Sequence, residues 1–227
     1  MKYKLTDETK NLGEVILHRI ECVTSFDDVK AGDKGGWIEK ESNLSQTGNA
    51  WVYGDAKVFD HARVLGNARV YDFARAFDHA SIYDSAQVHG YTQVFGNARV
   101  YGLAHAHDSA QVFGHARVYD SAQVCDNVMV FDHADVCGYA EVYDYAWVYG
   151  DAWVYGDAHV YGDAWVYGDA CVCGSAQVYG YARIYGHARV YDSAQVCDNV
   201  MVFDHADVCG KAEVHDDAYI FTIGKGV

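Results

Sequence analysis

The chain has 227 residues, 51% of them hydrophobic and none of them proline, and its formal net charge is −15. This composition is sufficient for one stable domain, and no run of 18 apolar residues is present, so we expect no membrane-spanning helix. Asp and Glu outnumber Lys and Arg by 32 to 17, which argues against direct nucleic-acid binding because phosphate contacts require basic side chains. The charge suits a soluble protein or one with a basic partner.

Residues 1–49 follow no six-residue register and are interpreted as an N-terminal β cap. Residues 15–20 (VILHRI) form a compact apolar run typical of a strand, and residues 26–29 and 34–39 follow, with glycines marking turns. A cap is expected because the open end of a coil exposes unpaired strand edges. Trp37 and Ile38 are the candidates for the lid, and a packing role is favoured for Trp37 over a ligand-stacking one.

Residues 50–221 are one six-residue unit repeated without insertion, with 29 unit openers from Ala50 to Ala218. Side chains alternate along a strand, so the opener and the Val two positions later point inward. The residue between them points outward and is free to vary in type, as Trp51, Lys57, Arg63, Gln87 and Asp135 illustrate. Gly or Asp closes each strand, and both tolerate a left-handed backbone corner. Each unit is therefore a three-residue strand and a bend.

Three such sides predict a triangular coil made of three consecutive units, which is an 18-residue period. An internal copy supports this period, because residues 114–138 recur unchanged as 186–210, an offset of four whole coils. Taking every third unit, the residue after the inward Val is always aromatic; this aromatic column contains Phe59, Phe77, Phe95, Phe113, Phe131, Tyr149, Tyr167, Tyr185, Phe203 and Phe221. One face therefore has its own chemistry.

The unit A-x-V-[YF]-[GD]-[DNSH] resembles the hexapeptide repeat of the left-handed parallel β-helix superfamily, best known for acyltransferases. Residues 35–56 (GGWIEKESNLSQTGNAWVYGDA) resemble the opening of a branch of uncharacterised bacterial and prophage proteins named as transferases or polymer-forming proteins. The resemblance implies an all-β, single-stranded, left-handed parallel β-helix of nearly ten coils. The left hand comes from the resemblance, since periodicity does not fix it.

The inward positions are almost all Ala and Val, so the interior is filled and leaves no cavity for a substrate or cofactor. We therefore expect no cofactor and place any function on the outer faces or the ends. Residues 222–227 form a C-terminal tail without an amphipathic helix. Either this tail or another copy of the chain is expected to cover the final coil.

An apolar patch on the aromatic face is the first candidate site. Stacked rings alone are explained as structural support for the ladder. The outward column of the same face, elsewhere polar, contains two methionines and two tryptophans in its second half, which solvent alone would not favour. The predicted interface, most simply with a second copy, comprises Met129, Phe131, Trp147, Tyr149, Trp165, Tyr167, Met201 and Phe203.

A histidine column is the second candidate, with neighbours one coil apart at a spacing that could hold Zn or Ni. A solvated corner explains it more simply, so no metal site is predicted and the candidates are weak: His61, His79, His115, His133, His187 and His205. Cys171 and Cys173 both point outward on one strand, and no second Cys pair or neighbouring His completes a tetrahedral set.

The acidic corners are the third candidate. From residue 50 onward the balance of acids and bases is −13, about half the charge density of a DNA duplex of the rod's length. A rod of this kind could mimic DNA and occupy a basic nucleic-acid-binding protein, as a phage or prophage inhibitor would. Residues chosen for corner geometry and solubility are the simpler explanation.

The N-terminus and the cysteines predict a cytoplasmic location. Residues 1–4 lead into no signal-peptide core. Four of the seven cysteines belong to the internal copy, and Cys137, Cys173 and Cys209 share a column two coils apart, roughly 9–10 Å, too far for a disulfide. We therefore expect the chain to lie in a reducing compartment, where cysteines stay as free thiols.

The function predicted from these observations is a non-enzymatic β-helix scaffold that binds itself or a protein partner through an outer face. The first alternative is the acidic DNA mimic. The second is an acyltransferase, for which the resemblance implies a histidine base on a loop; 29 units pass here without one extra residue. A histidine base without a substrate pocket cannot act as a catalyst, so the sequence favours a protein that is not an enzyme.

Overall fold

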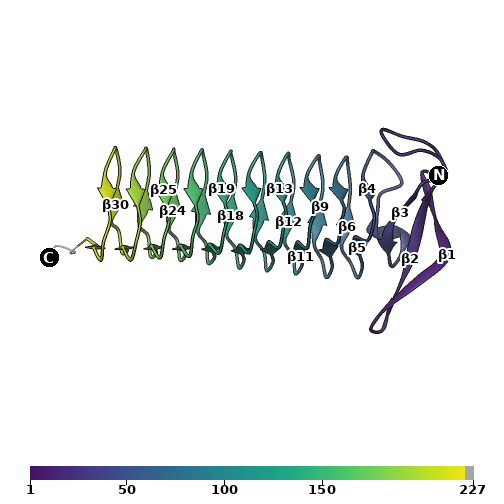
Figure 1. Cartoon of the computed structure of the whole chain (residues 1–227), viewed down its shortest axis with the longest axis horizontal. Helices are drawn as coiled ribbons and strands as arrows, with labels where there is room; N and C mark the ends of the chain where they lie inside the picture. Colours follow the sequence, from purple (N-terminus) through teal and green to yellow (C-terminus); the bar gives the residue numbers. More distant parts are fainter. Residues whose placement is uncertain (223–227) are drawn as a thin grey trace.

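The computed structural model describes residues 1–222 as a straight rod of stacked coils with a β cap at its N-terminal end (Figure 1). The regular elements of this part of the chain are 32 strands and one 3-10 helix, η1 (Glu41–Asn43). None of its helices is long and apolar enough to cross a membrane. The prediction of an all-β solenoid with an 18-residue coil is confirmed.

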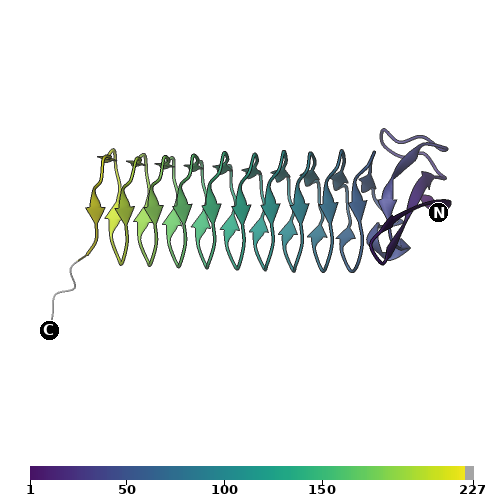
Figure 2. The same cartoon turned by 60° about the horizontal axis from the view of Figure 1, so that its bottom comes forward.

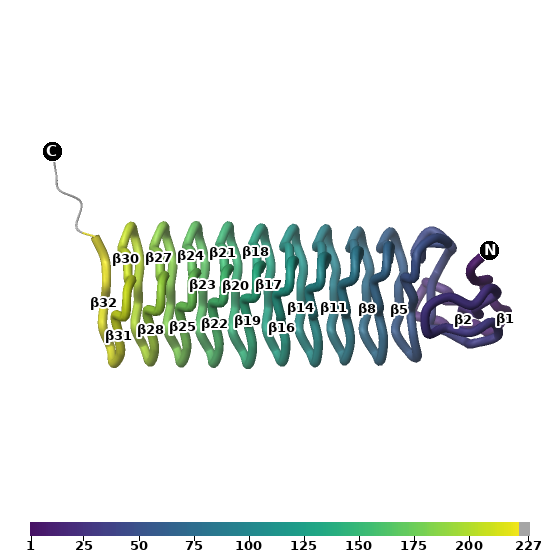
Figure 3. The backbone as a smooth tube through the Cα atoms, turned by 90° about the horizontal axis from the view of Figure 1, so that it is seen from above, coloured from purple at the N-terminus to yellow at the C-terminus, as the bar shows by residue number. Residues whose placement is uncertain are grey.

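Each six-residue unit forms one strand, and each strand pairs in parallel with the third strand after it, as Gln93 does with Gln111. The strands are thereby sorted into three sheets along the three sides of the rod (Figures 2 and 3). Face 1 contains β5 (Lys57–Val58), β8 (Arg75–Ala76), β11 (Gln93–Val94), β14 (Gln111–Val112), β17 (Met129–Val130), β20 (Trp147–Val148), β23 (Trp165–Val166), β26 (Arg183–Ile184), β29 (Met201–Val202) and β32 (Tyr219–Ile220). Face 2 contains β4 (Trp51–Val52), β7 (Arg69–Val70), β10 (Gln87–Val88), β13 (His105–Ala106), β16 (Gln123–Val124), β19 (Glu141–Val142), β22 (His159–Val160), β25 (Gln177–Val178), β28 (Gln195–Val196) and β31 (Glu213–Val214). Face 3 contains β6 (Arg63–Val64), β9 (Ser81–Ile82), β12 (Arg99–Val100), β15 (Arg117–Val118), β18 (Asp135–Val136), β21 (Trp153–Val154), β24 (Cys171–Val172), β27 (Arg189–Val190) and β30 (Asp207–Val208).

The interior is filled by the small openers and the Val side chains, which are fully buried from Ala50 to Val202. The strands have two residues rather than the expected three, although the residue after each strand also donates its N–H to the next coil, as Phe95 does to Val112 at 3.0 Å. In the final coil the inward Val214 and Ile220 are only partly buried, because no described strand follows them. The tail expected at 222–227 lies outside the described residues except for Thr222.

The corners explain why the sequence alternates between Gly and Asp there. Both residue types have positive φ at this position, for example 68° at Gly90 and 56° at Asp78. An L-residue in this region is unfavourable unless its side chain bonds locally. Asp78 Oδ2 accepts the N–H of Gly96, one coil on, at 3.0 Å, and eight further corner carboxylates accept the corresponding N–H of the following coil. The corner acids therefore stabilise the stacking of the coils.

The cap extends face 1 beyond the first coil. Strands β1 (Tyr3–Leu12) and β2 (Val15–Cys22) form an antiparallel hairpin, and β2 pairs with β3 (Lys34–Ile38), which runs parallel to β5. The expected strands at 15–20 and 34–39 are present, whereas β1 was not predicted. Trp37 and Ile38 lie opposite Lys57 and Val58 and so form the first rung of face 1, with Ile38 fully buried.

Three side chains that point away from the interior are nevertheless buried. Trp51 is 1% exposed because the rings of Tyr3 and Phe26 in the cap pack edge-on against it at 6.1 and 5.5 Å. Lys57, next to the cap, is also buried. Asp135 is buried in an ion pair with Arg117 on the preceding coil. The cap and the neighbouring coils cover these side chains, which the six-residue pattern alone does not reveal.

Candidate functional site

The aromatic column of face 1 is continuous over the whole rod. Each of its ten rings stacks on the next, with centroids 4.8–5.2 Å apart and ring planes within 16° of parallel. The strand spacing of a parallel sheet sets this distance, so the column follows directly from the stacking of the coils. The rings shield one edge of face 1 from solvent and support the ladder beneath them.

The second column of face 1 is formed by the outward residues of its strands. It contains four of the eight residues of the predicted interface: Met129, Trp147, Trp165 and Met201. Trp147 and Trp165 stack with centroids 5.1 Å apart, and each also packs edge-on against the aromatic column, Trp147 against Phe131 at 6.2 Å and Trp165 against Tyr149 at 6.4 Å. The guanidinium of Arg183 lies 4.9 Å above the Trp165 ring. All four outward residues are half-buried by their neighbours. The two adjacent columns contain the predicted interface residues as an apolar band that the exposed Arg183 interrupts between Trp165 and Met201. The band comprises Met129, Phe131, Trp147, Tyr149, Trp165, Tyr167, Met201 and Phe203.

A more exposed tryptophan lies on another face. Trp153, at the start of β21 on face 3, is 47% exposed, and the neighbouring Tyr155 is 38% exposed. The sequence analysis did not single out Trp153 because its column, unlike that of Trp147, contains no second tryptophan. It is an isolated apolar side chain of the kind that soluble proteins commonly expose.

The histidine column forms three stacked pairs rather than chelating ones. His61 and His79 have centroids 4.8 Å apart with planes 9° from parallel, and the pairs His115–His133 and His187–His205 are arranged alike. Imidazole lone pairs lie in the plane of the ring, so two parallel stacked rings do not direct their nitrogens at a common point between them. The arrangement favours the structural interpretation of this column.

Cys171 and Cys173 lie side by side on face 3, next to the hydroxyl of Tyr155. Burial and the neighbouring thiol raise the pKa of Cys171 to about 11, and hydrogen bonding to Cys173 and Cys171 raises the pKa of Tyr155. The Cys171 thiol is therefore protonated at neutral pH and weak as a nucleophile. All seven cysteines are free, in agreement with the absence of a disulfide framework.

A cluster on face 2 was missed by the sequence analysis. His107, Asp108 and Cys125 each offer one ligand atom within 4.8 Å of the others, the one such group of three among residues 1–222. His107 and Cys125 occupy the same position of consecutive coils, so the period already places them together. The sequence contains the signal, because His107 and Cys125 are 18 residues apart and each follows the inward residue of its unit.

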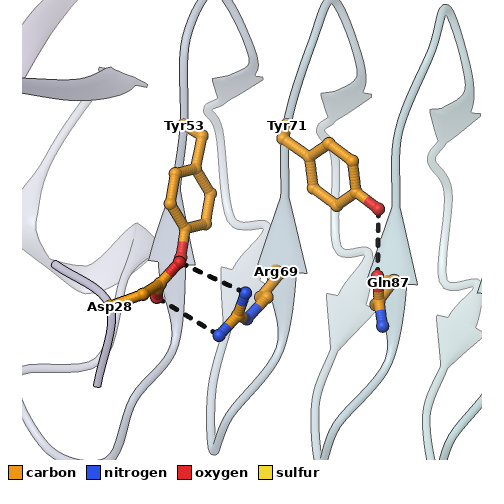
Figure 4. A pocket seen from close by; sticks show the side chains of 5 residues that line it. All are labelled: Asp28, Tyr53, Arg69, Tyr71 and Gln87. Carbon is orange, nitrogen blue, oxygen red and sulfur yellow. Dashed lines mark hydrogen bonds and ion pairs between the residues drawn. The ribbon is translucent and has the colours of Figure 1, made fainter.

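A groove lies where the cap meets face 2 (Figure 4). It encloses about 320 Å³ between Asp28 of the cap and the side chains of Tyr53, Arg69, Tyr71 and Gln87. Tyr53 donates to Asp28 at 3.0 Å, Arg69 pairs with the same carboxylate at 3.2 Å, and Tyr71 donates to Gln87 at 2.9 Å. Since these polar groups already bond to one another, the groove joins the cap to the rod rather than presenting unpaired groups to a ligand.

The coils, their continuous columns and the filled interior define a class, the parallel β-solenoid proteins built from hexapeptide-type repeats. Comparison with protein families agrees: the family described as YdcK Beta solenoid repeat matches residues 110–125 and 182–197. These two segments lie four whole coils apart and overlap the two internal copies. The repeat and the structure together fit a hexapeptide-repeat β-helix family.

A curated relative carries the same name. The chain is 38% identical over 60 residues to "Uncharacterized acetyltransferase YdcK" of Escherichia coli (strain K12). The alignment covers 23% of this chain and 18% of the relative, so the two proteins share only a small part of their lengths.

Proposed function

We propose that this chain is a non-enzymatic scaffold that pairs with a second copy of itself through the apolar band of face 1. The observation that carries the proposal is the stacked pair Trp147 and Trp165, set in an outward column that is otherwise largely Lys, Arg and Gln. Aromatic and methionine side chains grouped in this way are enriched at protein interfaces, where Lys and Glu are depleted.

The apolar band is regular enough to be covered by a partner that has a flat surface. Its rings are parallel and evenly spaced along several coils, and the strands beneath them pair without a register shift from β14 to β29. A second rod can lie along such a surface and cover both columns at once. A two-fold axis would make the contact self-complementary, which is the commonest symmetry of homodimers.

The test is the mass of the particle in solution, measured by sedimentation equilibrium for the wild type and for Trp147→Arg plus Trp165→Arg. We expect a dimer for the wild type and a monomer for the double variant, because the arginines would face each other across the contact. Trp153→Arg is the matched control, since it replaces an exposed tryptophan of face 3 and is expected to leave the mass unchanged. A monomeric wild type, or a double variant that remains dimeric, would rule out pairing through this face.

Salt distinguishes self-pairing from capture of a basic partner. With a formal charge of −15 per chain, two copies repel each other, so screening by salt should strengthen an apolar contact between them. A basic nucleic-acid-binding protein held by the acidic corners would instead be released as salt rises. Pull-down from a bacterial lysate at low and at high salt tests for such a basic partner, which should be captured only at low salt.

An acyltransferase is the second candidate, because the relative from Escherichia coli is named as an acetyltransferase. The coils of residues 50–222 contain no inserted loop that could present a histidine base beside a pocket. Thermal unfolding with and without acetyl-CoA tests this candidate directly. Clear stabilisation by acetyl-CoA would favour the transferase, and an unchanged midpoint would favour the scaffold.

A further inference from the structure

We propose that His107, Asp108 and Cys125 form a binding site for a divalent metal ion of the zinc class. The three residues supply one nitrogen, one oxygen and one sulfur ligand, a set that suits Zn²⁺ better than the hard cations Mg²⁺ and Ca²⁺, which prefer oxygen alone. The site is separate from the apolar band, because it lies on face 2.

The positions of the ligand atoms support the proposal. The candidate atoms lie within 4.8 Å of one another, and His107 Nδ1 is 2.8 Å from Asp108 Oδ2. In a tetrahedral zinc site neighbouring ligand atoms are about 3.5 Å apart, given Zn–S and Zn–N bonds of about 2.3 and 2.1 Å. His107 and Cys125 are half-buried and Asp108 is exposed, so side-chain rotation can close the remaining distance. The backbone of two consecutive coils, locked by ladder hydrogen bonds, holds the ligands in place.

The electrostatic surroundings suit a cation. Cys125 Sγ lies 3.7 Å from Asp126 Oδ2, and the exposed Asp108 carboxylate is a second acidic group of the cluster. Two carboxylates thus lie close to the thiol, and a divalent ion would supply positive charge among them. On the opposite side of His107 from Cys125, the ring of His89 stacks on the His107 ring with centroids 5.0 Å apart.

The internal copy provides a matched control. Cys197 lies in the same sequence context as Cys125, because residues 186–210 repeat residues 114–138. One coil earlier, however, Cys125 has His107 and Asp108, whereas Cys197 has Tyr179 and Gly180. His215 and Asp216 follow Cys197 by one coil, but the ligand atoms of these three residues do not all lie within 4.8 Å of one another, as those of His107, Asp108 and Cys125 do. The two thiols thus differ chiefly in the ligands beside them.

The experiment measures Zn²⁺ binding to untagged, metal-free protein by calorimetry, and Co²⁺ binding by absorption. We expect one strong Zn²⁺ site per chain and a thiolate-to-cobalt charge-transfer band in the near ultraviolet. Cys125→Ser should abolish the band and weaken Zn²⁺ binding about tenfold or more, as loss of a ligand does, and His107→Gln should weaken Zn²⁺ binding similarly. Cys197→Ser should bind as the wild type does.

Circular dichroism confirms that each variant keeps its β structure, so a loss of binding reports on the site itself. The proposal is wrong if the wild type binds no Zn²⁺, if Cys125→Ser binds as tightly as the wild type, or if the charge-transfer band disappears in Cys197→Ser instead.

Discussion

Arg117 and Asp135 lie in the same outward column of face 3, one coil apart, and the guanidinium donates to both carboxylate oxygens through Nε and Nη2. The internal copy repeats this pair as Arg189 and Asp207, with the same two bonds at 2.7 and 2.8 Å. The Asp135 side chain is 1% exposed and that of Asp207 is 39% exposed. The difference arises because β21 covers Asp135, whereas β30 is the last described strand of face 3.

This contrast predicts different costs for the same substitution. Asp135→Ala removes a buried carboxylate and its charged hydrogen bonds but leaves an Arg117 side chain that is 43% exposed and can be hydrated, so it should destabilise the protein by about 2 kcal/mol. Asp207→Ala breaks an exposed pair and should cost less than about 1 kcal/mol. Denaturant unfolding of both variants gives the two values, and equal losses would show that burial does not govern the strength of this pair.

Thr92 offers a stabilising substitution. Its side chain is fully buried as a unit opener before β11, and its hydroxyl Oγ1 has no hydrogen-bond partner. Val128 and Val200 occupy the same position in other coils of face 1, so the site accepts a valine side chain. Thr92→Val should raise the free energy of unfolding by about 1 kcal/mol, because a buried unpaired hydroxyl costs about 1–3 kcal/mol. A decrease in the unfolding free energy would indicate that a water molecule bonds this hydroxyl.

The side chain of Asp78 at its corner should contribute to the free energy of unfolding through its hydrogen bond and its tolerance of positive φ, and not through its negative charge. Asp78 has a φ of 56° and its Oδ2 accepts the N–H of Gly96 at 3.0 Å. Asp78→Ala loses the bond and keeps the unfavourable backbone, which should cost about 2 kcal/mol. Asp78→Asn retains an accepting oxygen and tolerates the left-handed region, so its unfolding free energy should stay close to that of the wild type. If both variants lose the same stability, the negative charge itself is required.

Tyr53 predicts a loss of stability at alkaline pH. Burial and the hydrogen bond to Asp28 raise its pKa to about 12, compared with about 10 in an unfolded chain. The folded protein therefore favours the neutral phenol; this contribution to stability is fully present below about pH 10 and is lost as the pH rises toward 12.

Tyr53→Phe should accordingly lose less stability than the wild type between about pH 10 and pH 12 in guanidinium unfolding. Tyr91→Phe, at an exposed corner position, is the matched control. An identical loss in Tyr53→Phe and the wild type would contradict the assignment.

The fold was predictable because nearly every coil repeats the same pattern of inward and corner residues. The inward Ala and Val positions fix the sides, the Gly and Asp positions fix the corners, and the aromatic column identifies one face without coordinates. Strand β1 was not predicted, because most of its residues are exposed and it lacks an alternating apolar pattern. The burial of Trp51 depends on Tyr3 and Phe26, which are far away in sequence and follow no repeat.

The candidate sites were predictable only in part. The period correctly placed Trp147 beside Trp165, since backbone register alone decides this. It also placed His107 and Cys125 together, but the approach of Asp108 to both depends on how a corner side chain turns. Similarly, sequence spacing gave the distance between His61 and His79 but not the parallel ring planes that set them apart from a chelating pair.

The identical segments 114–138 and 186–210 have a consequence for the gene. A crossover between them removes four whole coils, which shortens the molecule by about 19 Å at about 4.8 Å per coil and leaves every column of side chains aligned. The excised coils include Trp147 and Trp165 and only one of the two methionines. The length of the rod and the number of tryptophans on face 1 therefore change together: in a single recombination event, a longer descendant gains another tryptophan pair and a shorter one loses it.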